Sequence, residues 1–214
     1  MKESFGHPLT DILHHERHGG SIGILETQFV KMANYRRSAW YDETGLRWIG
    51  PSPNLRTLTA AALYPGVAMV EGANVSVGRG TPCPFELLGA PWINGTELAT
   101  YLNERKIPGV WFTGTKFTSS SDRYKDQVID GVRIILVDRN KLDAPALGIE
   151  IASALHRMYP GEFQLRKTLG LIGARWVLQA IKDGSDPRKI AQGWESSLEV
   201  FGKKRAKYLI YPAP

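Results

Sequence analysis

Short apolar runs, each bounded by glycine or proline, punctuate the chain up to about residue 140. Runs of this length and composition are typical of β-strands. The strands that they predict are Val67–Val70, Gly109–Phe112 and Val132–Val137, with a further candidate at Ser21–Leu25. Between the first two runs the spacing changes, because Leu98, Tyr101 and Leu102 recur one helical turn apart. This spacing predicts a helix over Thr96–Arg105, which Pro108 and Gly109 terminate.

Beyond residue 140 the apolar positions recur at helical spacing. Three helices are expected: one with Leu147, Ile151, Leu155 and Met158, which stops at Tyr159–Pro160–Gly161; one with Trp176, Val177, Ala180 and Ile181, which stops at Asp183–Gly184; and one that opens at the Asp186–Pro187 cap and bears Ile190, Trp194, Leu198 and Phe201. The last stripe is interpreted as core rather than as a cofactor surface. Strands alternating with helices indicate the α/β or α+β class, and we predict α/β.

The composition argues against a membrane protein, a nucleic-acid-binding protein and a Cys-rich zinc protein. The 214 residues are 43% hydrophobic and 22% charged, as in ordinary globular domains. No apolar run is long enough for a membrane helix, so no membrane partner is expected. The net charge of +6 is scattered, and we interpret its densest cluster, residues 203–207, as a solvated helix end rather than a nucleic-acid site. A single cysteine, Cys83, excludes an intramolecular disulfide and a Cys-rich zinc site.

The histidines near the start predict no metal site. His14 and His18 lie four residues apart on a predicted helix, Leu9–His18, but the intervening spacing departs from H-E-x-x-H. A polar surface helix is the better interpretation, and no cofactor is expected. Residues 1–4 are followed by no apolar stretch, so the sequence predicts no signal peptide in this chain.

The segment 71–81 concentrates groups that bind polar ligands. It contains three glycines together with a carboxylate, an amide, hydroxyls and a guanidinium, supplied by Glu71, Asn74, Ser76, Arg79 and Thr81. The glycine spacing matches neither a dinucleotide fingerprint nor a Walker loop. Such a mixture suits a ligand rich in hydroxyl, amide and carboxylate groups, such as a sugar acid. A polar surface turn explains the same composition equally well, and the residues alone leave both interpretations open.

Two segments contain side chains that could act as nucleophiles, but neither has the sequence context of a catalytic one. Ser119–Ser121 is not set in a G-x-S-x-G elbow, so a loop is expected there. Cys83 lies between two prolines, and the sequence indicates no histidine that would activate its thiol.

Several motifs follow one another in a fixed order. They are Thr44-Gly-Leu-Arg-Trp48, Pro51-Ser-Pro-Asn54, the segment from Tyr64-Pro-Gly-Val67 through Gly78-Arg-Gly-Thr81, Pro84-Phe-Glu-Leu-Leu-Gly-Ala-Pro91, Ile107-Pro-Gly-Val110, Gly131-Val132, Val137-Asp-Arg139 and Tyr208-Leu-Ile-Tyr211. This ordered set resembles the motifs of the bacterial exo-β-N-acetylmuramidases of the NamZ type. The resemblance extends from about Gly6 to Tyr211. It implies hydrolytic release of N-acetylmuramic acid from non-reducing ends of peptidoglycan fragments, by a family whose members are commonly exported.

The resemblance also implies a domain organisation. Family members join a Rossmann-like N-terminal domain to a smaller α/β domain, with the active site between them. Residues 1–50 are expected to be the truncated tail of the first domain, and residues 51–214 the second domain. The absent part of the first domain is then a possible partner, and we expect it to supply at least one carboxylate, because glycoside hydrolysis usually needs two.

Site residues are carried over from the matching motifs. The resemblance implies Glu71 and Glu86 as catalytic or supporting carboxylates, without deciding which is the acid. The implied substrate-binding residues are Arg36, Asn54, Asn74, Arg79 and Thr81. An arginine fork suits the lactyl carboxylate of muramic acid, and Asn74 suits a hydroxyl or the acetamide. No metal ligands are implied.

Two functions follow as alternatives. In the first, the chain belongs to an exo-β-N-acetylmuramidase whose substrate is a muramyl sugar or peptidoglycan fragment. In the second, it is a truncated, non-catalytic remnant that binds muramyl ligands without hydrolysing them. Turnover of a chromogenic N-acetylmuramide distinguishes the two.

Overall fold

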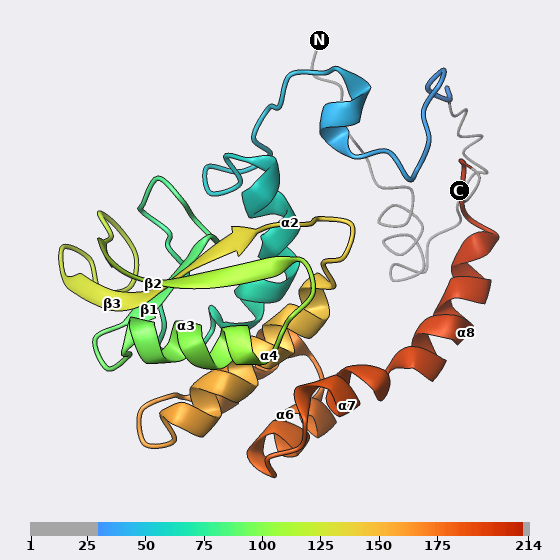
Figure 1. The fold of residues 1–214 in the computed structure, drawn as a ribbon. Helices are drawn as coiled ribbons and strands as arrows, with labels where there is room; N and C mark the ends of the chain where they lie inside the picture. Colours follow the sequence, from blue (N-terminus) through green and yellow to red (C-terminus); the bar gives the residue numbers. More distant parts are fainter. Residues whose placement is uncertain (1–29, 212–214) are drawn as a thin grey trace, which may run out of the picture. The chain divides into compact units, whose positions relative to one another are not determined.

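Three antiparallel strands form the only sheet in the part of the chain that the structure, a computed structural model, describes, residues 30–211. The strands are β1 (Leu87–Ala90), β2 (Val110–Thr118) and β3 (Val128–Leu136), in the spatial order β1-β3-β2 (Figure 1). Val132 in the central strand pairs with Leu88 on one side and with Gly114 on the other. The fold is therefore mixed α/β, with a small antiparallel sheet in place of the parallel sheet of a doubly wound fold.

The strands at residues 109–112 and 132–137 are confirmed as parts of β2 and β3, although both strands extend beyond the predicted bounds. Strand β1 was not predicted. All four of its residues are buried, so the sequence shows no alternation of polar and apolar positions there. The predicted elements Leu9–His18 and Ser21–Leu25 lie outside the described residues.

Two of the longer helices begin at side-chain caps. In α3 (Gly95–Glu104) the Asn94 side chain accepts a hydrogen bond from Glu97 N, and in α4 (Ala144–Met158) Asp143 accepts one from Ala146 N. Figure 1 shows α3 lying along one face of the sheet with α4 next to it. Helix α3 buries one apolar face, as the spacing predicts, whereas α4 is buried on all sides over residues 147–152. Helix α4 ends where Tyr159 and Pro160 were expected to stop it.

The predicted strand at Val67–Val70 is wrong. This run is the end of α2 (Leu58–Val67) and the short 3₁₀ helix η2 (Ala68–Val70). A short apolar run bounded by glycine does not distinguish a buried strand from a buried helix turn. The helix is fixed by tertiary contact, because Gly66 packs against α4 so closely that a Cβ there would clash with the carbonyl oxygen of Ala144.

The C-terminal region contains more helices than expected. It comprises η3 (Leu165–Thr168), α5 (Leu169–Ile172), α6 (Arg175–Lys182), α7 (Pro187–Gln192) and α8 (Glu195–Ala206). The single helix predicted from Asp186 is divided at Gly193 and Trp194 into α7 and α8. The assignment of its whole stripe to the core is also wrong: Ile190 is buried, but Leu198 and Phe201 are 57% and 54% exposed.

A segment before α2 is tied to the β3–α4 loop. It contains the 3₁₀ helix η1 (Tyr41–Thr44). Arg139 forms ion pairs with Asp42 at 2.7 Å and with Glu43 at 3.3 Å, and its guanidinium stacks 4.8 Å from the centre of the Trp40 ring. The indole Nε1 of Trp40 also donates to Asn140 Oδ1 at 2.8 Å. These contacts hold residues 40–44 against the β3–α4 loop.

The chain divides into two compact units, Ser38–Leu209 and a smaller one formed by Met1–Arg37 with Ile210–Pro214. In the described part of the smaller unit, the Tyr211 hydroxyl accepts a hydrogen bond from Met32 N at 2.8 Å. The ring of Tyr211 lies edge-on to that of Tyr35, with 4.8 Å between centroids. The predicted boundary at residue 50, and the assignment of residues 1–50 to a Rossmann-like domain, stay predictions.

Candidate functional site

The glycine-containing loop after η2 packs between β1 and the loop that follows β2. Ser76 forms an antiparallel bridge with Gly89, which ties the loop to β1. Gly78 and Gly80 have φ angles of 77° and 75°, a backbone region that favours glycine. At Gly80 a Cβ would also lie only 2.6 Å from Ser119 Oγ. These glycines therefore let the loop approach other parts of the same protein, and Ser119–Ser121 is the loop that receives it.

Arg79 and Glu71 form the charged centre of this loop. Arg79 Nε donates to Glu71 Oε1, and Arg79 Nη2 donates to Oε2 at 3.1 Å, so the pair is bidentate. The side chains are 29% and 25% exposed, respectively, so the pair remains accessible to a ligand. The hydrogen bonds from Arg79 to Glu71 raise the pKa of the guanidinium above its usual value, against the effect of partial burial.

An aromatic platform supports the guanidinium. The carbon Cζ of Arg79 lies 5.1 Å from the ring centroid of Phe85, which is buried and has a φ of 64°. Tyr64 packs edge-on against Phe85 at 4.9 Å between centroids. A cation held over an aromatic face by a carboxylate has little freedom to rotate. The loop thus presents a pre-oriented guanidinium and carboxylate at the surface.

Glu86 lies where the chain enters β1. Its carboxylate accepts a hydrogen bond from Thr57 Oγ1 at 3.1 Å, and Thr57 is also the N-cap of α2. The nearest cation is Arg133, with 3.8 Å between Nη2 and Oε2. The Glu86 side chain is only 13% exposed. It is therefore a shielded carboxylate with weaker charge compensation than Glu71.

Two predicted substrate-binding side chains bond to the protein backbone. Asn74 Nδ2 donates to the carbonyl of Glu162 at 2.9 Å, and Asn74 Oδ1 accepts from Gln164 N at 2.9 Å. Thr81 is buried, and its hydroxyl donates to the carbonyl of Gly78 at 2.6 Å while it accepts from Cys83 N. Both side chains shape the loop; binding of substrate by either stays a prediction.

The structure brings together only part of the predicted set. Glu71 and Arg79 are in direct contact, whereas Glu86 bonds to the start of α2. Asn54 is half-buried in the turn before α2, where its backbone N–H donates to Ser52 Oγ at 3.3 Å. Arg36 belongs to the smaller unit. Roles for Asn54 and Arg36 in binding also stay predictions.

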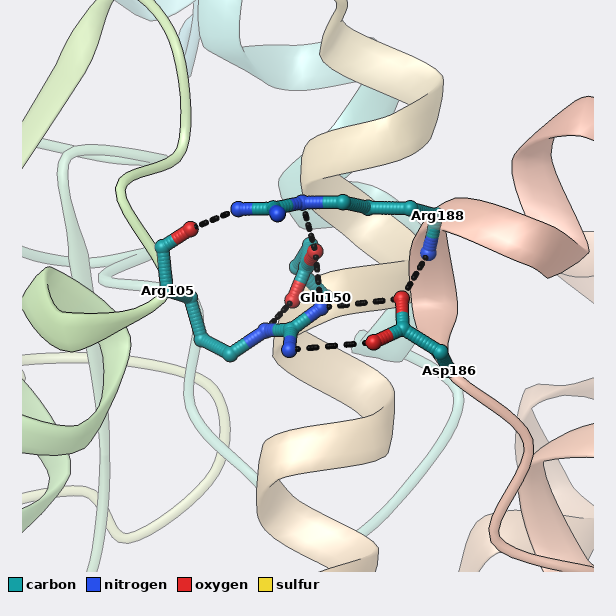
Figure 2. Close-up of polar contacts among 4 residues, drawn as sticks. All are labelled: Arg105, Glu150, Asp186 and Arg188. Carbon is teal, nitrogen blue, oxygen red and sulfur yellow. Dashed lines mark hydrogen bonds and ion pairs between the residues drawn. The ribbon is translucent and has the colours of Figure 1, made fainter.

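A second charged cluster was not predicted (Figure 2). Arg105, at the end of α3, donates Nε and Nη2 to both oxygens of Glu150 at 2.8 and 2.9 Å. It also donates to both oxygens of Asp186 at 3.2 and 3.1 Å. Arg188 Nη2 donates to the carbonyl of Arg105. One guanidinium therefore joins α3, α4 and the N-cap of α7.

This cluster is structural in character. Glu150 is only 7% exposed and lies on α4 among buried apolar residues. Each of its two carboxylate oxygens accepts a hydrogen bond from Arg105, which also lowers the pKa of Asp186 below its usual range. The signal in the sequence was a single glutamate between Leu147 and Ile151 on an apolar helix face, since such a residue needs a partner when it is buried.

The described residues contain neither a candidate metal site nor a candidate membrane-spanning helix. Between residues 30 and 211, no group of three or more His, Cys, Asp or Glu side chains is arranged to hold a metal ion. Within the same range, none of the helices has the length and apolar character needed to cross a bilayer.

The protein is therefore a mixed α/β domain whose candidate site is a loop with a bidentate Arg–Glu ion pair. Comparison with known proteins gives the family. Residues 62–211 match the C-terminal domain family described as "Exo-beta-N-acetylmuramidase NamZ, C-terminal", and residues 9–59 match the corresponding N-terminal family. The chain is 36% identical over 210 residues to the peptidoglycan beta-N-acetylmuramidase NamZ of Bacillus subtilis (strain 168). The chain therefore belongs to the exo-β-N-acetylmuramidase NamZ family.

Crystal structures of two DUF1343 family proteins from Bacteroides fragilis NCTC 9343 share the fold. The first has a TM-score of 0.73 and 23% identity, covering 83% of this chain and 49% of that protein. The second has a TM-score of 0.57 and 24% identity, covering 77% of this chain and 44% of that protein. The match to the Bacillus enzyme covers 91% of this chain and 51% of the enzyme, so this chain spans about half the length of its relatives.

Proposed function

We propose that this chain is the C-terminal portion of a peptidoglycan exo-β-N-acetylmuramidase, which releases N-acetylmuramic acid from the non-reducing ends of peptidoglycan fragments. One observation carries the proposal: the accessible Arg79–Glu71 pair on Phe85 lies in the motif that the chain shares with its family. The relative named for this activity, at 36% identity, supports the substrate class.

Arg79 is proposed to recognise the lactyl carboxylate. Glu71 occupies Nε and Nη2 of the guanidinium, and within residues 30–211 Nη1 has no hydrogen-bond acceptor. A ligand carboxylate can accept from Nη1, or displace one oxygen of Glu71 and share the fork. Glu71 then serves to orient Arg79 and to limit its affinity for other anions, which would favour a substrate that satisfies the whole site.

Glu86 is the better candidate for the proton donor. A general acid needs a carboxyl oxygen that is free to give its proton to the leaving-group oxygen. Both oxygens of Glu71 accept hydrogen bonds from Arg79, whereas Glu86 accepts one from Thr57 Oγ1 and lies 3.8 Å from the nearest cation. The second carboxylate of the reaction is proposed to come from the N-terminal domain of the family, of which residues 9–59 match a part.

A non-catalytic binding function is the second candidate. The observation that favours it is that both glutamates already have intramolecular partners, which suits a preformed recognition surface as well as a reacting centre. In this case muramyl ligands bind at Arg79 and are released unchanged.

Turnover separates the two candidates. The 214-residue chain is incubated with para-nitrophenyl N-acetyl-β-muramide, alone and together with a separately produced N-terminal domain, and nitrophenol release is followed. The enzyme proposal expects release that Arg79→Ala reduces about 100-fold and Lys203→Ala leaves unchanged. Calorimetric binding of N-acetylmuramic acid without any release would establish the second candidate, and equal release by both variants would refute the assignment of Arg79.

A further inference from the structure

A groove lies between the η3–α5 segment and α6. None of the residues that line it belongs to the proposed muramidase site. Its volume is about 360 Å³, within the range of pockets for small ligands. Its floor is apolar and is formed by Leu165 and Leu169 from η3 and α5 and by Leu178 from α6. An apolar floor of this size matches a short hydrocarbon group.

The charged side chains that line the groove are all basic. They are Arg166, Arg175 and Lys182, beside the polar Gln179, and no aspartate or glutamate lines it. None of these three cations forms an ion pair with another residue between 30 and 211, in contrast to Arg79, Arg105 and Arg139. Cations that converge on a concave surface without compensating carboxylates produce a positive potential that attracts anions.

His156 contributes an unpartnered polar atom to the same wall. Its Nδ1 is buried and has no hydrogen-bond partner among residues 30–211. Buried polar atoms are nearly always bonded, so such an atom marks a place where a partner is missing. His156 also lines an adjoining pocket of about 380 Å³, which places it on the partition between the two cavities.

The wall formed by η3 is held in place by the loop of the proposed active site. Asn74 bonds to the backbone of Glu162 and Gln164, directly before η3. Gly72 packs so closely on the carbonyl of Lys167 that a Cβ there would lie 2.6 Å from the oxygen. The groove is therefore preformed, and a ligand would not have to order it on binding.

We propose that this groove is a second ligand site, which binds a small amphipathic anion: a short apolar chain that ends in an oxyanion. The apolar part lies on the three leucines, and the head group is bound by Arg166, Arg175 and Lys182. Guanidinium groups bind both carboxylates and phosphates through paired hydrogen bonds, so either head group satisfies the chemistry. Neither Glu71 nor Glu86 lines this groove, so ligand binding there does not involve the proposed catalytic carboxylates.

Isothermal titration calorimetry of the 214-residue chain with octanoate and with octyl phosphate tests the proposal. Saturable one-to-one binding of at least one of these is expected, and comparing the two identifies the head group. Octyl glucoside, which has the same chain without a charge, and acetate, which has the charge without the chain, are expected to bind at least tenfold more weakly. Equal binding of octyl glucoside, equal binding of acetate, or no binding of either amphiphile would overturn the proposal.

Variants locate the ligand. Arg166→Gln/Arg175→Gln is expected to weaken binding of the preferred amphiphile at least tenfold, whereas Arg123→Gln, which removes an exposed arginine from the loop after β2, leaves it unchanged. Thermal melts establish that each variant is folded, and the single variant Arg175→Gln replaces the double variant if the latter does not fold. Unchanged affinity in the folded groove variant would refute the location.

Discussion

Two arginines of this domain, Arg79 and Arg105, each form a bidentate pair with a glutamate. The surroundings of the two pairs indicate different roles. Arg79 and Glu71 lie on a glycine loop, each about a quarter exposed, over the ring of Phe85. Arg105 lies between helices, where Glu150 is almost fully buried and Asp186 supplies a second carboxylate (Figure 2). The accessible pair suits recognition of a ligand. The second suits the joining of α3, α4 and α7, because both oxygens of the buried Glu150 and both oxygens of Asp186 bond to one guanidinium.

Removing the buried cation is expected to have the largest effect. Arg105→Met leaves Glu150 as a buried carboxylate whose next cation, Arg188, is 4.0 Å away. Breaking a buried pair in this way costs about 3–5 kcal/mol, which lowers the melting temperature by roughly 6–20 °C in a domain of this size. Differential scanning calorimetry measures this shift. Lys203→Met, which breaks the exposed pair with Glu199, is the matched control and should change little.

Removing the accessible pair should reverse the pattern. Arg79→Ala and Glu71→Gln are expected to reduce nitrophenol release or N-acetylmuramic acid binding about 100-fold, which corresponds to about 2.7 kcal/mol. The melting temperature should fall far less than in Arg105→Met, because a quarter-exposed pair is screened by solvent. A loss of stability as large as that of Arg105→Met would show that both pairs are structural and would end the distinction.

Asp186, in the cluster around Arg105, should also contribute to the response to acid. Arg105 lowers the pKa of Asp186 from 3.8 in the folded state, so the ionised carboxylate stabilises the fold above that value. This stabilisation is lost as the pH falls through the lower folded pKa. Asp186→Asn keeps an N-cap for α7 but removes the titration, so its free energy of unfolding should fall less between about pH 5 and about pH 3. Urea unfolding across this range provides the measurement. A steeper fall in the variant than in the parent chain would contradict it.

The smallest effect is expected at a third arginine. Arg139 also contacts two carboxylates, Asp42 and Glu43, but about half of each carboxylate side chain is exposed. Arg139→Ala should therefore melt almost as the parent chain does, although its geometry resembles that of Arg105. A shift comparable with that of Arg105→Met would mean that the number of carboxylates, rather than their burial, decides the energy.

Local rules predicted the helices with clear caps and strong periodicity. Helices α3, α4 and α6 lie close to where their spacing placed them, and Asp186 caps a helix as expected. The incorrect and missed predictions share one cause: the segments concerned do not alternate between polar and apolar residues in a way that identifies a strand or a helix. Val67–Val70 and β1 are short runs that are almost entirely buried, so their pattern does not reveal which backbone they adopt. The stripe through Phe201 recurs at helical spacing, but no residue of α8 is buried.

The sequence by itself determined the family and singled out Glu71 and Arg79, because ordered motifs and residue types are properties of the chain alone. Only the tertiary structure decided that these two form one pair, that Asn74 and Thr81 bond to backbone, and that Glu150 finds Arg105 from another helix. The physical reason is distance. Hydrogen bonds and burial depend on residues that are far apart in the sequence, and no local pattern records which of them meet.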